Sequence, residues 1–204
     1  MADKELRTHH TTTSSPAQPV DAPSIVSAYD WGALGHVVDV GGGDGSLLIA
    51  LLNEYPALRG TVVDLPAAAE TARKMLFAAG LSDRANAVAA DPLDAVPDGA
   101  EGYLLSAVLC DRNDDDANTI LRNCATAAGE DGAVFVIEPV PPVDGVVVDT
   151  GPLGVTGTAL PEPPGSARQA RGLTELTALA ERAGLQVTAV HTAGTAAIVE
   201  LAAR

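Results

Sequence analysis

The stretch Val37-Val38-Asp39-Val40-Gly41-Gly42-Gly43-Asp44-Gly45 decides the fold class of this chain. The apolar residues at its start predict a strand over 36–40, and the apolar run Ser46–Glu54 that follows it predicts a helix. Glycines are needed where a backbone turns sharply and lets a ligand approach without a Cβ. A helix N-terminus also offers free N–H groups. The stretch therefore predicts a strand, a ligand-binding loop and a helix; a plain tight turn is the alternative.

The loop departs from two common phosphate-binding motifs. A P-loop needs Gly-Lys-Ser/Thr where this chain has Asp44-Gly45-Ser46, and the dinucleotide fingerprint needs a glycine at the position of Ser46. Asp39 and Asp44 also place negative charge beside the loop, which disfavours a pyrophosphate and favours a ligand with a cationic centre. S-adenosylmethionine (SAM) carries a sulfonium and an ammonium group. The pattern Gly41-x-Gly43-x-Gly45 therefore favours SAM or its demethylated product, S-adenosylhomocysteine.

Two further acidic residues follow predicted strands. Asp64 ends the second strand, where a carboxylate can accept hydrogen bonds from both ribose hydroxyls; a helix N-cap is its alternative role. Asp91 ends the third strand region, where an acid can face the adenine amino group; a turn aspartate before Pro92 is equally expected there.

Strand and helix patterns alternate along the rest of the chain. Strands are predicted over 36–40, 60–64, 85–90, 102–109, 133–138, 185–191 and 196–201, and helices over 20–29, 46–54, 67–79, 115–128 and 173–183. This order predicts an α/β fold with a mostly parallel sheet, which binds ligands beyond the carboxyl ends of its strands. Residues 1–19 are predicted to be a disordered leader and residues 20–204 a single domain. The Pro- and Gly-rich segment Val140–Ala170 is predicted to be a lid or a disordered loop.

Composition excludes several classes of function. The net charge of −15 disfavours nucleic acid and anionic membranes as partners, and an aromatic content of 3 % disfavours a base-stacking channel. The N-terminus lacks the apolar core of a signal peptide, and no apolar run reaches the ~18 residues of a membrane helix. The two cysteines and four histidines provide no metal-ligand spacing, so no metal site is expected. We expect a cytoplasmic protein.

Four segments, VVDVGGGDGSLLIALL, YPALRGTVVDLP, AAGLSDRANAVAADPLDAVPDGAEGYLLSAVL and ILRNCATAAGEDGAVFVIEPV, resemble the SAM-dependent O-methyltransferases of the plant caffeate type. The bacterial antibiotic-tailoring branch, with the carminomycin and hydroxyneurosporene enzymes, is the most similar. The resemblance implies a Rossmann-like class I methyltransferase fold, mostly parallel with a C-terminal antiparallel strand. It also implies cofactor roles for residues of this chain: Gly41 and Gly43 at the methionine moiety, Asp64 and Leu65 at the ribose, Asp91 and Pro92 at the adenine, and Ser106 near the methionine end.

The resemblance also implies the positions of the catalytic residues. The family's general base is the histidine of Leu-His-Asp-Trp, and this chain has Cys110 there, followed by Asp111. Of the family's two supporting glutamates, one matches Glu138 and the other is replaced by Ala170. Cys110 and Glu138 are therefore the catalytic candidates. For Cys110 the alternative is a small packing residue at a strand end, and for Glu138 it is a strand-end capping group.

The resemblance finally implies the reaction: SAM-dependent methyl transfer to a small aromatic or polyketide-type acceptor. The alternative is a SAM-binding protein with other tailoring chemistry (hydroxylation, decarboxylation or cyclisation) or a catalytically impaired remnant. Members of the family carry an N-terminal helical dimerisation domain, and Met1–Pro19 stands in its place here. We therefore expect either a truncated chain or a separate helical partner that supplies this domain.

Overall fold

The computed structural model describes residues 21–139 and 171–204, which form a seven-stranded sheet with helices on both faces. The strands are β1 (His36–Val40), β2 (Arg59–Asp64), β3 (Ala85–Ala89), β4 (Gly102–Ser106), β5 (Ala133–Pro139), β6 (Leu185–Ala193) and β7 (Ala196–Ala203). Their spatial order is β3-β2-β1-β4-β5-β7-β6. Neighbours from β3 to β5 pair in parallel, and β7 is antiparallel to both β5 and β6. The predicted α/β class, with its C-terminal antiparallel strand, is confirmed.

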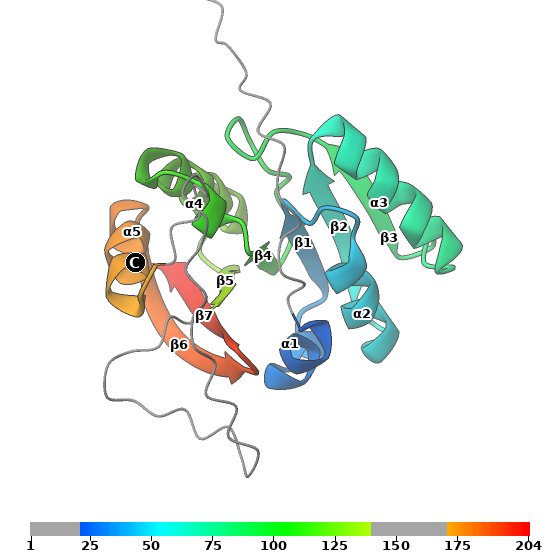
Figure 1. Ribbon diagram of the computed structural model, residues 1–204, viewed down its shortest axis with the longest axis horizontal. Coiled ribbons are helices and arrows are strands. Elements are labelled where there is room, and N and C mark those ends of the chain that lie inside the picture. Colours follow the sequence, from blue (N-terminus) through cyan, green and yellow to red (C-terminus); the bar gives the residue numbers. More distant parts are fainter. Residues whose placement is uncertain (1–20, 140–170) are drawn as a thin grey trace, which may run out of the picture.

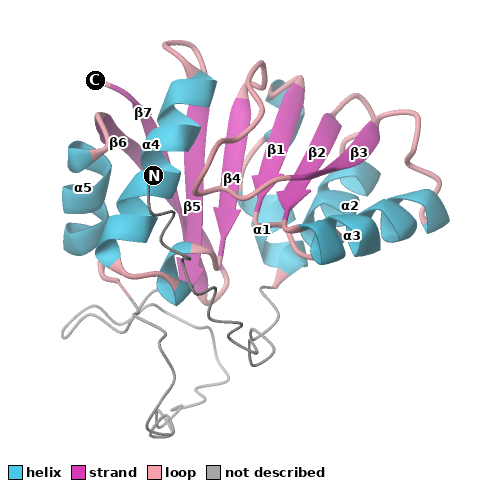
Figure 2. Cartoon of the chain, turned by 90° about the horizontal axis from the view of Figure 1, so that it is seen from above, coloured by secondary structure: helices cyan, strands magenta, loops and turns pink. Residues whose placement is uncertain are grey.

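The helices divide between the two faces of the sheet. Figure 1 shows α1 (Ala22–Ala28), α2 (Ser46–Glu54) and α3 (Pro66–Ala78) on one side, and α4 (Asp114–Ala128) and α5 (Leu173–Arg182) on the other. Alternate residues of each strand pack against the helices on opposite faces of the sheet: Val37 and Leu104 pack towards α2, whereas Val38 and Leu105 pack towards α4. Figure 2 shows the strands side by side in one sheet between the two layers of helices. Because the central strands are buried on both faces, their sequences are almost continuously apolar.

The predicted elements agree with the structure to within a few residues, except at the end of β4. The apolar run 102–109 predicted one long strand, but β4 ends at Ser106 and a 3-10 turn, η2, occupies Leu109–Asp111. Ala107 breaks the strand, because it takes a left-handed conformation with φ of +54° while its N–H bonds to Ile137 O. A second 3-10 turn, η1 (Trp31–Ala33), was not predicted. Apolar periodicity does not distinguish a strand from a buried turn.

Two predicted segments, the leader over 1–19 and the loop over 140–170, lie outside the described residues. Within the described ranges, no helix is long and apolar enough to cross a membrane.

Candidate functional site

The carboxyl ends of the parallel strands meet at one edge of the sheet, and the predicted site residues lie along it. In register, Val40 pairs with Val63 and Ser106 pairs with Ile137. The residues that follow those pairs are therefore neighbours. The chain crosses over between β1 and β4, since β2 and β3 lie on one side of β1 and all later strands on the other. Such a switch point is where open α/β sheets bind ligands.

The loop between β1 and α2 has the geometry that its glycines predicted. Gly41, Gly43 and Gly45 have φ values of +70°, +60° and +79°, which side chains rarely tolerate. At Gly41 a Cβ would lie 2.9 Å from Val108 Cγ2, so this glycine also allows close packing against the segment that follows β4. A Cβ on Gly43 would meet nothing within 4 Å. The Gly43 backbone therefore faces open space, as a ligand-binding loop requires.

Asp64 joins the end of β2 to this loop. Its Oδ2 accepts a hydrogen bond from Gly43 N at 2.8 Å, and its Oδ1 accepts one from Leu65 N at 2.6 Å. The alternative role as a helix N-cap is not observed, because Leu65 is the N-cap of α3 and makes no side-chain cap bond. A carboxylate has about four lone-pair sites, so Asp64 keeps acceptor capacity towards a ligand. The Leu65 side chain beside it is 49 % exposed, although it is apolar.

Asp39 is a buried carboxylate beneath the loop. It is 1 % exposed, and neither of its carboxylate oxygens has a hydrogen-bond partner among the described residues. A Cβ on Gly42 would lie 2.5 Å from Asp39 Oδ2, so the loop backbone rests against this carboxylate. Burial, together with the smaller effect of the charges of Asp64 and Asp44, raises the pKa of Asp39 to about 7. Sequence reasoning identified its charge but not its burial. Buried polar groups without partners are rare and call for an explanation.

The adenine candidates, Asp91 and Pro92, form a tight turn after β3. Asp91 Oδ1 accepts a hydrogen bond from Leu93 N at 3.0 Å, which is the turn role given above as its alternative. Asn123 of α4 holds this turn, because its Nδ2 donates to Pro92 O at 2.8 Å and to Leu93 O at 3.1 Å. Sequence analysis missed Asn123, since a helical asparagine carries no local signal of such a contact. Ser106 ends β4, half-buried, at the same edge.

The catalytic candidates lie around η2. Glu138 is 6 % exposed, and its Oε1 accepts hydrogen bonds from Leu109 N at 3.0 Å and from Cys110 N at 3.1 Å. Burial raises the pKa of Glu138, whereas hydrogen bonds from Cys110 and Leu109 and the charge of Arg171 lower it in part. Glu138 is thus a capping group; its catalytic role stays a prediction.

The structure corrects the predicted location of Cys110. This residue is buried, but it lies within η2 and not at a strand end, because β4 has already ended at Ser106. Its Sγ lies 4.0 Å from Asp111 Oδ1. Cys124 is a buried residue of α4, and burial raises the pKa of its thiol to about 12.

Arg171 is a site residue that the sequence analysis missed. It is 3 % exposed and donates hydrogen bonds to Leu109 O, Arg112 O and the Asp114 carboxylate. Those partners are 57–62 residues away in sequence, so no local pattern could have found this contact. The neighbouring position 170, where the resemblance placed a missing acid, lies outside the described residues.

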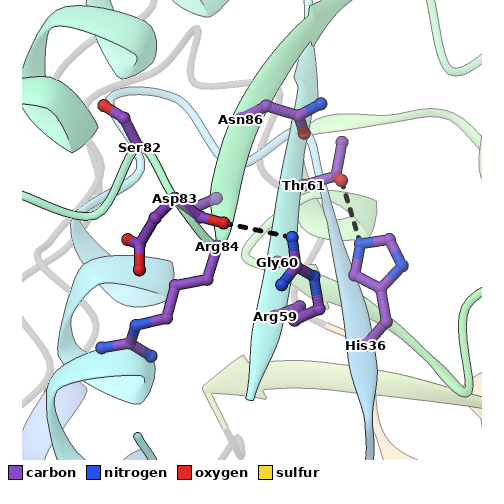
Figure 3. A pocket seen from close by; sticks show the side chains of 9 residues that line it. His36, Arg59, Gly60, Thr61, Ser82, Asp83, Arg84 and Asn86 are labelled. Carbon is purple, nitrogen blue, oxygen red and sulfur yellow. Dashed lines mark hydrogen bonds between the residues drawn. The ribbon is translucent and has the colours of Figure 1, made fainter. Parts of the chain in front are cut away.

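A hollow of about 250 Å³ lies at the opposite edge of the sheet, where β1, β2 and β3 begin (Figure 3). Three of its polar side chains already have partners here: His36 Nε2 pairs with Thr61 Oγ1 at 3.0 Å, and Arg59 Nη2 donates to Asp83 O at 3.2 Å. Arg84 donates to carbonyl oxygens at the end of α2, including Leu52 O at 2.7 Å. None of the predicted site residues lines this hollow.

Known proteins resemble this chain in both sequence and structure. The family model for an O-methyltransferase domain matches residues 1–186. A 2,7-dihydroxy-5-methyl-1-naphthoate 7-O-methyltransferase from Streptomyces carzinostaticus is 43 % identical over 204 residues, which is 99 % of this chain and 58 % of that protein. An aclacinomycin 10-hydroxylase from Streptomyces purpurascens is 44 % identical over 118 residues, which is 58 % of this chain and 31 % of that protein.

A solved structure shows the same fold. It is that of an O-methyltransferase from neocarzinostatin biosynthesis, in complex with SAM and 2-hydroxy-5-methyl naphthoic acid. The two superpose with a TM-score of 0.75 at 44 % identity, over 88 % of this chain and 52 % of the other. The chain thus spans about half of the length of the relatives it matches.

Proposed function

Because this chain belongs to the O-methyltransferase domain family, we propose that it is the cofactor-binding part of a SAM-dependent methyltransferase. Its acceptor is a small aromatic or polyketide-type hydroxyl compound, of the naphthoate class named for the first relative. We also propose that it acts in the cytoplasm. Its net charge of −15 repels phosphate groups, so we propose neither a nucleic-acid nor an anionic-membrane partner. The separate helical partner stays a prediction.

The unpartnered Asp39 carboxylate carries this proposal. A buried negative charge beneath an open glycine loop is costly by itself, and a cationic ligand beside the loop lowers that cost. SAM is such a ligand, whereas a pyrophosphate would add repulsion from Asp39, Asp44 and Asp64. The residues present therefore fit SAM better than a dinucleotide.

The other residues of this edge fit the remaining parts of the cofactor. The free acceptor capacity of Asp64 suits the ribose hydroxyls, and the exposed Leu65 side chain offers an apolar surface next to them. Asp91 and Pro92 border the adenine, and Gly41, Gly43 and Ser106 border the methionine moiety. When bound, SAM supplies an electrophilic methyl group on its sulfonium. S-adenosylhomocysteine would occupy the same residues after transfer.

On the acceptor side, the chain contributes chiefly orientation. Cys110 stands at the family's base position, but a thiol is a weaker hydrogen-bonding group than the imidazole of the family's histidine. Glu138 is already committed to two backbone amides. The proposed transfer is an in-line displacement whose rate depends mainly on holding acceptor and cofactor together. Good orientation of two reactants commonly lowers the activation barrier by ~7–11 kcal/mol. We expect methylation of phenols by this chain alone to be slow.

Calorimetry with SAM, S-adenosylhomocysteine and NAD tests the proposal. We expect both adenosyl compounds to bind with micromolar dissociation constants, a free energy of about −7 to −8 kcal/mol. NAD should show no binding. Binding of NAD without binding of SAM would overturn the proposal.

One observation favours a second candidate, non-methylating tailoring chemistry on a SAM-binding scaffold. It is the 44 % identity to a protein named as a hydroxylase. Product analysis separates the two candidates. A methylated product formed together with one equivalent of S-adenosylhomocysteine supports methyl transfer, whereas a changed acceptor with SAM left intact supports the second candidate.

A further inference from the structure

Two buried side chains of opposite charge bond to the backbone of the η2 turn. Glu138 Oε1 accepts from the N–H groups of Leu109 and Cys110 at 3.0 and 3.1 Å. On the other side, Arg171 Nη1 donates to Leu109 O at 2.5 Å and Nη2 donates to Arg112 O at 2.8 Å. Arg171 is 3 % and Glu138 6 % exposed, so neither contact is weakened by solvent.

Arg171 also fixes the start of the next helix. Its Nε and Nη2 donate to Asp114 Oδ1 at 3.2 and 2.8 Å, and Asp114 is the first residue of α4. One guanidinium therefore bonds to the η2 turn, to the residue after it and to the helix that follows. This requires several donors in one plane, which arginine has and lysine lacks.

The η2 turn needs such support because it follows a strained residue. Ala107, directly after β4, has φ of +54°, and strained non-glycine residues persist only where the surroundings determine them. A single 3-10 turn also has little cooperative stability of its own. Without its two partners, the turn would be expected to relax away from the sheet edge.

From this geometry we propose that Arg171 is a positioning residue for methyl transfer: it holds the η2 turn, and with it Cys110, as the wall against which the acceptor is oriented. The inference rests on the proposed function. Arg171 acts through the backbone of η2, to which its guanidinium bonds directly. The glycine loop, Asp39 and Asp64 are not among its partners, so cofactor affinity should be independent of it.

The test uses the full chain with Arg171→Lys and Arg171→Gln. Arg122→Gln is the matched control, since it removes an exposed arginine of α4. Alkylation of Cys110 by iodoacetamide is followed by peptide mass spectrometry, which separates it from Cys124. We expect both Arg171 variants to react at Cys110 at least tenfold faster, with their dissociation constants for SAM within twofold of the parent. The control should change neither quantity.

Turnover supplies a second readout. We expect kcat for an accepted phenol to fall at least tenfold in both Arg171 variants, with KM for SAM unchanged and no rescue by lysine. Unchanged Cys110 reactivity and kcat in Arg171→Lys would overturn the inference. If these variants fail to fold, Asp114→Asn weakens the same guanidinium contact and should raise Cys110 reactivity in the same direction; no rise would also overturn it. Failure of the parent chain to bind SAM counts against the proposed function, whereas parent-like variants count against Arg171.

Discussion

Asp39 and Glu138 are both buried carboxylates at the same edge of the sheet, yet their surroundings differ. Asp39 is 1 % exposed and has no hydrogen-bond partner among the described residues, whereas Glu138 is 6 % exposed and accepts two backbone N–H groups. Glu138 is also near the positive charge of Arg171. The buried carboxylate beneath the glycine loop thus lacks a partner, which a ligand can supply. The buried carboxylate at η2 already has its partners within the protein. One region is built to bind and the other to hold its shape.

The largest effect is expected where the carboxylate has no partner. Because burial raises the pKa of Asp39 from 3.8 to about 7, the folded chain binds this proton more tightly than the unfolded chain. Its contribution to stability is therefore complete below pH 4 and is lost as pH rises towards 7, by ~4 kcal/mol at most. Asp39→Asn should remove this slope and raise the melting temperature of the ligand-free chain at pH 8, as calorimetry across pH 5–8 would measure. An unchanged slope would mean that Asp39 is not the titrating group.

Asp64→Ala should come next in size. It removes an acceptor that joins Gly43 to β2 and is proposed to bind the ribose. We expect affinity for SAM to fall by ~1.5–3 kcal/mol, the range for hydrogen bonds to a charged group. Asp83→Ala, an exposed carboxylate at the opposite edge, is the control and should leave affinity unchanged. Equal losses in the two variants would point to net charge instead of this site.

Glu138→Gln should change stability less than Asp39→Asn does. The pKa of Glu138 is also raised, so its contribution to folding stability likewise decreases as the pH rises and Glu138 ionises. However, glutamine keeps an oxygen for the two amides, and we expect a change within about 1 kcal/mol by urea unfolding. If Glu138→Gln stabilised the chain as much as Asp39→Asn does, the two carboxylates would not differ in the way proposed.

Cys110→Ala should have the smallest effect. If the position of η2 matters more than the thiol it carries, loss of the thiol should leave single-turnover methylation within about twofold of the parent. Removing one buried sulfur should cost about 1 kcal/mol or less, near the low end of core truncations. Collapse of turnover in this variant would make Cys110 a catalytic residue.

The same contrast explains what the sequence could predict. The glycine loop and the strand-end acids Asp64 and Asp91 are local signals, and the structure places them at one edge. The burial of Asp39 depends on both neighbouring strands and on the loop folding over it, which no single segment encodes. Arg171 reaches η2 from about 60 residues away, and η2 itself was hidden in an apolar run. Chemistry confined to one segment was predictable, whereas contacts between segments were not.

The position of β7 has a consequence for synthesis of the chain. This strand is the last of the described elements in sequence, but it lies inside the sheet, between β5 and β6. Residues 133–139 must therefore wait for residues 196–203 to leave the ribosome before that side of β5 is covered. At ~5–20 residues per second, the nearly 60 intervening residues take about 3–12 s. During that interval β5 is an exposed, largely apolar strand edge, so this step is where a chaperone would be expected to act on the nascent chain.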